Sequence, residues 1–414
     1  MDEHFQDADQ NQHIHDAVLS GSVDTFKQQI PTDDGNQQAW LEKRNHEGKT
    51  VVMIAAEGGH REIVRYIIEE YTDVDINKVD SKEGNTVLHH LAINGMVEEA
   101  KLVFDKNDRL ALKQNYEGLT PIHIAVQQKN LPLLEVFAPV KHQCLLIKDI
   151  KGENPLFYAV RSGLPELYNW FYTGLTLQTP GMTPGQTPGQ TPGGEANIFA
   201  TQGTADFFKA RGEQNYKGQT IEHVVCLTRM KNGQEGDKAM AIVDAIKPRP
   251  DIKDYYGNLP LFYALQENDT QMVMRLFKKG RDYFNIRNYK NESIFHVAAK
   301  SGATDSIKIL IDGITFTEEL LKKDYLGNTP LHYAARKGNL SILEFFVNEG
   351  GEPTRQMLDL QNDFALTVRE AVLEKIRHFE EIITQTEGRQ TYVRSLQDYI
   401  AKLQAVLRFI SSKR

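Results

Sequence analysis

The sequence predicts an all-α repeat protein in which short helices stack one after another along the chain. Three observations lead to this prediction. A short residue pattern recurs along most of the 414 residues. Its copies are separated by a nearly constant interval, which is the signature of repeat architectures. Each copy also joins a turn signal to the residues that start a helix, so the repeating unit is a turn followed by a helix.

The clearest copy begins at Asp324 and reads D-Y-L-G-N-T-P-L-H-Y-A-A. Its fourth position is glycine in every copy except one, where it is asparagine. The successive spacings of that position are 36, 34, 34, 66, 39, 34 and 36 residues. The interval of 66 corresponds to one repeat plus an insertion of similar length. The aligned residues are Gly48, Gly84, Gly118, Gly152, Gly218, Gly257, Asn291 and Gly327.

Each position of the pattern has a local structural reason. Asp or Asn at the first position and Gly at the fourth form a tight turn, because glycine adopts positive φ without strain. The threonine hydroxyl caps the following helix, and proline suits its first turn. Small residues at the end of the pattern let neighbouring helices approach closely. A second turn, at Gly338 for example, leads to a helix with apolar residues three and four apart, such as Ile342, Leu343, Phe346 and Val347.

These residues resemble the ankyrin-repeat family, and the similarity extends from about residue 14 to about residue 372. The T-P-L-H-x-A-A frame is a specific signal for that family. The resemblance implies stacked helix pairs with projecting β-hairpin fingers and a concave surface that binds partner proteins. It also implies that the ninth-position histidine bonds to nearby backbone and orders the finger. The residues at that position are His89, His123, His223, His296 and His332.

The predicted solenoid has about nine units and four segments. Residues 1–172 form an N-terminal array of about five units, of which the first is a cap. Residues 173–205 are a Thr-Pro-Gly-rich flexible insertion, interpreted as a surface loop or as a hinge, with Thr-Pro pairs as possible kinase sites. Residues 206–365 form a C-terminal array of four units. Residues 366–414 contain a degenerate final repeat and an amphipathic C-terminal helix.

The C-terminal helix carries apolar residues in steps of four and three, which places them on one face. We expect this face to cap the last repeat. Dimerisation through a coiled coil is the alternative, although fewer than three heptads make a weak zipper, so a monomer is expected. The residues are Tyr392, Leu396, Tyr399, Leu403, Val406 and Ile410.

Composition narrows the class of partner and the compartment. The formal net charge of −8 disfavours nucleic acid and anionic membranes, both of which need clustered Lys and Arg. The two cysteines, Cys144 and Cys226, exclude a disulfide framework and favour a reducing compartment. No signal peptide and no apolar run long enough to span a bilayer are found, so a cytoplasmic location is expected.

The sequence predicts no enzyme, no cofactor and no metal site. His223 and Cys226 are three residues apart, but Cys226 occupies a small-residue position of the frame and is interpreted as core packing. Cys144 has the same interpretation. The Asp73-x-Asp75-x-Asn77 run lacks the glycine and the glutamate of a calcium loop. The alternative is an enzyme whose site lies in the degenerate repeat around residues 202–246 or in the C-terminal helices.

Tyrosine is concentrated at two positions of the frame that the turn chemistry does not fix. Because tyrosine offers a large amphipathic contact at low entropic cost, a stripe of exposed tyrosines is typical of binding surfaces. Packing of the rings on neighbouring fingers is the alternative. The second position holds His46, Lys82, Tyr116, Ile150, Tyr216, Tyr255, Tyr289 and Tyr325, with Tyr256 beside one of them. The tenth position adds Tyr158, Tyr263 and Tyr333.

The predicted function is therefore non-catalytic recognition of a protein partner by the concave face, centred on the fingers of the C-terminal half. Polar contacts are expected from Lys300, Arg336 and Lys337 at the ends of the inner helices. A scaffold whose two arrays hold different partners is one alternative. A bacterial effector delivered into the cytosol of a host cell is another.

Overall fold

The computed structural model describes residues 16–31, 34–172, 202–229, 251–277, 283–311, 316–385 and 390–413. The described residues are helices joined by turns, and they divide into two compact units, Met1–Tyr216 and Lys217–Arg414. The predicted all-α repeat fold is confirmed. Most of the Thr-Pro-Gly insertion, up to residue 201, lies outside the described residues.

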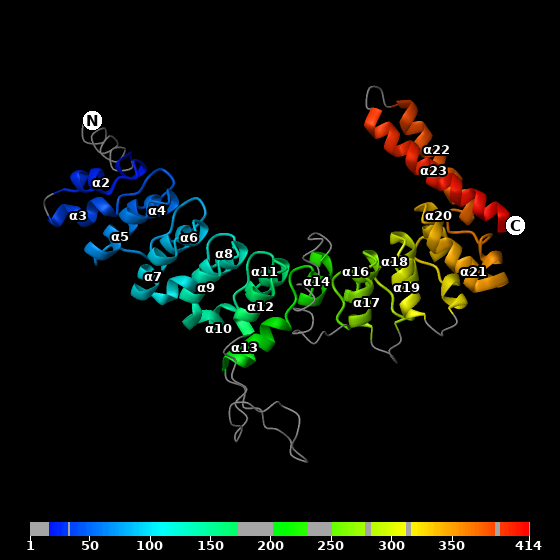
Figure 1. Ribbon diagram of the computed structural model, residues 1–414, viewed down its shortest axis with the longest axis horizontal. Coiled ribbons are helices and arrows are strands. Elements are labelled where there is room, and N and C mark those ends of the chain that lie inside the picture. Colours follow the sequence, from blue (N-terminus) through cyan, green and yellow to red (C-terminus); the bar gives the residue numbers. More distant parts are fainter. Residues whose placement is uncertain are drawn as a thin grey trace, which may run out of the picture. The chain divides into compact units, whose positions relative to one another are not determined.

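Unit 1 consists of two layers of helices (Figure 1). Consecutive inner helices pack against one another, and each also packs against the outer helix that follows it. The inner helices are α4 (Val51–Glu57), α6 (Val87–Ile93), α8 (Pro121–Gln127) and α11 (Pro155–Arg161). The outer helices are α5 (Arg61–Glu70), α7 (Val97–Lys106), α9 (Leu131–Val136) and α12 (Pro165–Tyr172).

The two ends of unit 1 are closed by additional helices. At the N-terminal end, α2 (Val23–Gln29) packs on α5, and α3 (Asp34–Leu41) precedes the first finger. The sequence pattern anticipates α2 as a cap but not α3. At the other end, α10 (Lys141–Cys144) contacts α13 (Gln202–Arg211).

Unit 2 repeats the same two-layer arrangement. Its inner helices are α14 (Ile221–Arg229), α16 (Pro260–Gln266), α18 (Ile294–Ser301) and α20 (Pro330–Arg336). The described outer helices are α17 (Thr270–Leu276), α19 (Thr304–Leu310) and α21 (Leu340–Met357), the last being interrupted at Gly351. A pair of longer helices, α22 (Val368–Gln385) and α23 (Gln390–Lys413), completes the unit.

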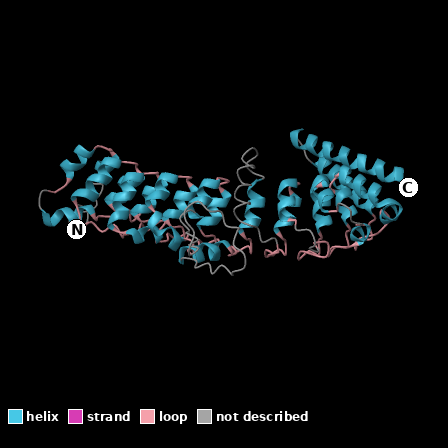
Figure 2. Ribbon diagram, turned by 60° about the horizontal axis from the view of Figure 1, so that its bottom comes forward, coloured by secondary structure: helices cyan, strands magenta, loops and turns pink. Residues whose placement is uncertain are grey.

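The fingers are tight turns that project on one side of the helices of each unit (Figure 2). In a typical finger the first-position side chain accepts hydrogen bonds from the backbone N–H groups of the third and fifth positions. Asp254 Oδ1 accepts from Tyr256 and from Asn258, both at 2.9 Å. The fourth residue has positive φ, as at Gly257 (φ 76°), which explains the recurrent glycine. Among the described residues the pairing is too short to form named strands, and one isolated bridge joins Arg44 to Thr50.

The ninth-position histidines join each finger to the next. His296 Nδ1 accepts from the Ser293 backbone N–H at 3.2 Å and caps the start of its own helix. Its Nε2 donates to the Asn328 carbonyl in the next finger at 3.1 Å. The same bridge links His89 to Leu119, His123 to Glu153, His223 to Asn258 and His332 to Leu366. The structural role that the family resemblance implies is thereby confirmed.

The last repeat has a complete finger that the glycine pattern does not identify. Asn362 accepts from the Phe364 and Leu366 backbone N–H groups, and Ala365 takes positive φ in place of glycine. Glu370 replaces the histidine, and it accepts from the Thr367 backbone N–H at 2.8 Å. The inner helix of this repeat is α22.

Most of the apolar stripe of the C-terminal helix is buried within the chain, whereas Tyr392 near the start of the helix is 47% exposed and Tyr399 is partly exposed. Leu396, Leu403, Val406 and Ile410 are each at most 9% exposed, and α23 packs against α21 and α22. The predicted helical cap is therefore confirmed. Within the described residues, no helix combines the length and the apolar character that crossing a membrane requires.

The buried histidines predict that acid destabilises the fold. Burial lowers the pKa of His89, His123 and His296 to about 4, below the usual 6.5. The unfolded chain therefore binds protons below pH 6.5 that the folded chain does not, so stability is complete above that pH and is lost towards pH 4. When the pH falls from 7.5 to 5, we expect the free energy of unfolding to decrease by about 2 kcal/mol for each of these histidines.

Urea unfolding at the two pH values measures this effect. A His296→Gln variant serves as the control. We expect it to be less stable than the wild type at pH 7.5 but to lose less unfolding free energy when the pH is lowered to 5. Equal stability of the wild-type protein at both pH values would contradict the role assigned to the histidines.

Candidate partner-binding groove

Consecutive fingers are joined by a backbone hydrogen bond at their tips. The second-position N–H donates to the third-position carbonyl of the preceding finger, as from Tyr289 to Tyr256 at 2.9 Å. In unit 1 the donors are Ser81, Tyr116, Ile150 and Tyr216, and in unit 2 they are Tyr255, Tyr289, Tyr325 and Asp363. The bond fixes the spacing of the tips, so their side chains recur at regular intervals.

The second finger departs from the frame that the sequence suggests. Asp80 takes the role of the first position there, because its Oδ1 accepts from the Lys82, Glu83 and Gly84 backbone N–H groups. Ser81 then makes the bond to the preceding finger, through Glu47. Lys82 is thus an additional residue in a longer turn, and its equivalence to the fingertip tyrosines is wrong.

The fingertip tyrosines are exposed although they contact the preceding finger. Tyr116, Tyr216, Tyr255, Tyr256, Tyr289 and Tyr325 are between 57% and 70% exposed. In four of them, Tyr116, Tyr216, Tyr255 and Tyr289, one ring edge lies against the glycine of the finger before it. A Cβ atom built on Gly84 would lie 2.7 Å from the Tyr116 ring, and one on Gly257 would lie 2.9 Å from the Tyr289 ring. The contact holds the ring in place and leaves its outer face free.

The tenth-position tyrosines have a different environment, because their hydroxyl groups are used inside their own finger. Tyr263 donates to Asp254 Oδ2 at 2.6 Å, Tyr158 donates to Asp149 in the same way, and Tyr333 donates to Asp324. Burial and the acceptor carboxylate raise the pKa of Tyr263 to about 12. These tyrosines brace the turn, and Tyr263 also presents its ring to a groove.

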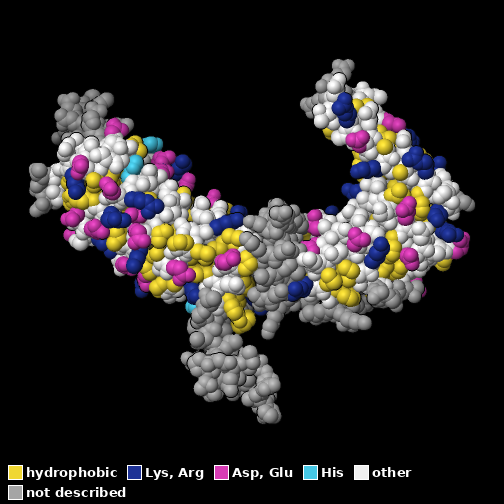
Figure 3. Space-filling model, in the orientation of Figure 1, with side chains coloured by type: hydrophobic (Ala, Val, Ile, Leu, Met, Phe, Trp, Pro, Cys, Tyr) yellow, Lys and Arg dark blue, Asp and Glu magenta, His cyan; other side chains and the backbone are white. Residues whose placement is uncertain are grey.

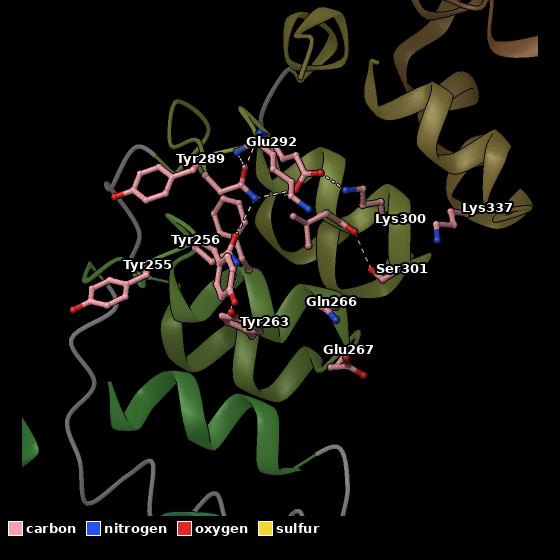
Figure 4. Close-up of a pocket in the computed structure, with 15 residues that line it drawn as sticks. Tyr255, Tyr256, Tyr263, Gln266, Glu267, Tyr289, Glu292, Lys300, Ser301 and Lys337 are labelled. Carbon is pink, nitrogen blue, oxygen red and sulfur yellow. Dashed lines mark hydrogen bonds and ion pairs between the residues drawn. The ribbon is translucent and has the colours of Figure 1, made fainter. Parts of the chain in front are cut away.

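That groove lies in unit 2 and has a volume of about 730 Å³ (Figure 4). The fingertips Tyr255, Tyr256 and Tyr289 form one side, and the ends of the inner helices form the other. Tyr255 and Tyr289 point the same way in Figure 4, outward from the helices. The helix residues are Gln266 and Glu267 from the end of α16, Lys300 and Ser301 from α18, and Lys337 from the end of α20.

Polar side chains in the groove are partly held by one another. Glu292 forms an ion pair with Lys300 and accepts from Asn288 Nδ2 at 2.8 Å. The Lys300 ammonium also lies 4.3 Å from the centre of the Tyr333 ring, a cation–π contact. Burial raises the pKa of Glu267 above its usual value. The groove therefore combines aromatic surface with oriented polar groups.

A smaller groove of about 350 Å³ occupies the equivalent place in unit 1. Tyr116 stands where Tyr289 stands in unit 2, and Gln127 and Gln128 stand where Lys300 and Ser301 stand. Ile93 and Ile124 add apolar surface. Both grooves lie between two successive fingers and the ends of their inner helices, so each unit has a groove at this position of the repeat.

The structure brings together part of the predicted surface. Tyr255, Tyr256, Tyr263, Tyr289, Lys300 and Lys337 line the larger groove, and Tyr116 lines the smaller one. Tyr325 and Arg336 lie in the adjoining repeat of unit 2, and Tyr216 lies in unit 1. Sequence reasoning missed Gln266, Glu267 and Ser301, which occupy the thirteenth and fourteenth frame positions. The residue types at those two positions differ between copies of the repeat, and this variation is the signal that could have identified them as groove residues.

The residues considered for catalysis are packed in the described core. Cys144 is fully buried, its thiol donates to the Lys141 carbonyl at 2.9 Å, and burial raises its pKa far above the usual range. Cys226 is buried in α14 and His223 forms the inter-finger bridge. Across the described residues, no group of three or more His, Cys, Asp or Glu is placed to hold a metal ion. The predicted alternative site at residues 202–246 falls partly outside them.

Comparison with known proteins gives partial matches along the chain. A family model described as ankyrin repeats (three copies) matches residues 14–114 and 261–357. A mouse relative, "Protein fem-1 homolog A-like", is 36% identical over 21% of this chain and 13% of its own length. The "NF-kappa-B inhibitor cactus" of Drosophila melanogaster is 39% identical over 20% of this chain and 17% of its own length.

A longer match is weaker. The Drosophila melanogaster "Transient receptor potential cation channel subfamily A member 1" is 22% identical over 69% of this chain and 25% of its own length. The chain thus spans a quarter or less of the length of each of these relatives.

The fingertip tyrosines should contribute little to folding. Tyr289→Ala and Tyr116→Ala remove rings that are about two thirds exposed, so each should cost no more than about 1 kcal/mol of unfolding free energy. Leu331→Ala, at a fully buried position of α20, should cost about 2–5 kcal/mol. Urea titration of the three variants compares them. A Tyr289→Ala cost equal to that of Leu331→Ala would show that the rings are structural.

Proposed function

Because the chain is an ankyrin-repeat protein, we propose that it recognises a protein partner without catalysis, through the groove of unit 2 and its fingertip tyrosines. The proposal rests on one observation: the fingertip tyrosine rings are exposed to solvent, and the fold nevertheless holds them in fixed positions. Tyr255, Tyr289 and Tyr325 follow one another on successive fingers, and each tip is bonded through its backbone to the finger before it. Pre-positioned aromatic side chains bind with little loss of entropy, which is a property of interface hot spots.

The family as a whole supports a binding role. One relative is named as an inhibitor of NF-kappa-B, and such a name implies recognition of another protein, which is what we propose for this chain. The other predicted properties belong to the same proposal: a cytoplasmic protein, monomeric, without cofactor, metal, nucleic acid or membrane as its partner. The two cysteines are buried and are not joined in a disulfide, and this suits a reducing compartment.

The difference between the two grooves supports the scaffold alternative. The groove of unit 1 has Gln127, Gln128 and two isoleucines where the groove of unit 2 has Lys300, Ser301, Gln266 and Val297. Surfaces at equivalent positions with different chemistry suit different ligands. The division of the chain into two compact units, Met1–Tyr216 and Lys217–Arg414, is compatible with two occupants.

The triple variant Tyr255→Ala, Tyr289→Ala and Tyr325→Ala tests the proposed function. The tagged full chain is used to isolate its partner from cells, and the affinity of the purified partner is then measured by calorimetry. We expect the triple variant to weaken binding by about 3 kcal/mol, or roughly a hundredfold, while its melting temperature changes by only a few degrees.

Tyr116→Ala is the matched control, because Tyr116 makes the same ring contact with a glycine in the finger before it. This control should leave the affinity for a partner bound by unit 2 unchanged. A folded triple variant that binds as tightly as the wild type would place the contact surface elsewhere and refute the proposal.

A further inference from the structure

Several repeats neutralise the charge at the end of the inner helix in the same way. The thirteenth frame position lies at the last turn of that helix, and it forms an ion pair with the fifth position of its own repeat. In the repeat of α4, Lys49 Nζ and Glu57 Oε1 are 2.6 Å apart, and in the repeat of α11, Arg161 Nη2 and Glu153 Oε1 are 2.5 Å apart. Lys300 and Glu292 form the same pair in unit 2. The charge is cancelled within each of these repeats.

The repeat of α20 breaks this pattern. Its thirteenth position is Arg336, but its fifth is Asn328, which has no charge to offer. Arg336 is exposed, and none of the described carboxylates forms an ion pair with it. Lys337 follows, also exposed, and lines the groove described above. Two cations therefore stand at the end of α20 without the neutralising partner that comparable repeats have.

A third cation from α22 points at the same place. The Lys375 ammonium donates to the Arg336 carbonyl at 3.0 Å and to the Tyr399 hydroxyl at 3.2 Å, and it lies 4.9 Å from the centre of the Tyr399 ring. Burial and the charges of Lys337 and Arg336 lower the pKa of Lys375 to about 8. We call Arg336, Lys337 and Lys375 the cationic cluster. Lys and Arg side chains are visible over this part of unit 2 in Figure 3.

We propose that the cationic cluster and the adjoining groove of unit 2 bind an acidic peptide segment of a partner protein. This inference rests on the proposed function and adds the chemistry of the partner. Aspartate or glutamate side chains would pair with Arg336 and Lys337, which offer charge-assisted hydrogen bonds. Apolar or aromatic side chains of the same segment would lie on the Tyr256, Tyr263 and Tyr289 surface. Lys337 belongs to both parts, so one extended segment reaches from one to the other.

The surface is better suited to a peptide than to nucleic acid. The groove beside the cluster contains the exposed carboxylate of Glu267, which repels a continuous phosphate backbone. Nucleic-acid sites need a longer run of cations than the three found here. A peptide presents its negative charges at intervals and fits a surface of alternating cationic and aromatic groups.

A phage library of random dodecapeptides, selected on the immobilised full chain, tests the inference without a known partner. We expect the enriched peptides to be rich in Asp and Glu. The affinity of the best peptide for the chain is then measured by fluorescence anisotropy at 150 mM NaCl. The variant carrying Arg336→Glu and Lys337→Glu should lower that affinity by about tenfold or more, because it reverses two charges at the contact.

The control variant carries Lys101→Glu and Arg109→Glu, two exposed cations of unit 1 that line neither groove. It also reverses two charges and should change the affinity less than about twofold. Lys375→Met removes the third charge and keeps an unbranched side chain of similar length beside Tyr399, so it should weaken binding without unfolding unit 2. Circular dichroism melting curves establish that every variant is folded.

The failures of the two proposals are distinguishable. Enriched peptides that are neutral or basic, and whose binding depends on Tyr255 and Tyr289, would overturn the acidic partner and leave the proposed function standing. Acidic peptides that bind the Arg336→Glu and Lys337→Glu variant as tightly as the wild type would show that the peptide does not bind at the cationic cluster. A twenty-residue oligo-dT that binds more tightly than every peptide would overturn the partner class. Absence of any enriched peptide would count against both proposals.

Discussion

The hydrogen bond from a buried histidine to the carbonyl of the next finger is the interaction on which the rest of the structure depends. Each imidazole accepts from the backbone at the start of its own helix and donates to the following repeat. One neutral side chain therefore caps a helix and fixes the distance to its neighbour. A protonated ring could not do both, because it has no acceptor. The histidine rings must therefore stay neutral to make both hydrogen bonds, and their burial keeps them neutral.

This division of labour separates the residues that build the repeat from those that are free to vary. The first, fourth, sixth and ninth positions form the turn, the cap and the bridge. The second-position residue contributes its backbone N–H to the tip of the preceding finger, so its side chain is not needed for that bond. The thirteenth and fourteenth positions end the inner helix and face the groove. Partner specificity can therefore change at these positions without disturbing the stack.

The repeat fold was predictable from the sequence because its signals are local. Glycine at positive φ, the threonine cap and the spacing of apolar residues each reflect a requirement within one unit, and they recur. The finger at Asn362 was missed because Ala365 occupies the glycine position and Glu370 the histidine position. The frame of the second finger was misplaced by one residue because Asp80 starts a longer turn. Both errors arise where one residue type performs the structural role of another.

The site was less predictable because it depends on contacts between repeats. Exposure of the fingertip tyrosines follows from their place in the turn, but their contact with the preceding glycine does not.

The cationic cluster could not be predicted from the amino-acid composition either. A formal charge of −8 is a sum over the whole chain, whereas a partner meets only the charges that neighbours have not already cancelled. Because Glu292 neutralises Lys300 while Asn328 leaves Arg336 unpaired, an acidic protein presents a positive surface at the end of its last inner helices. The charge that a partner meets is therefore determined by the repeat that lacks the ion pair between its fifth and thirteenth positions. The net charge of the chain has less influence.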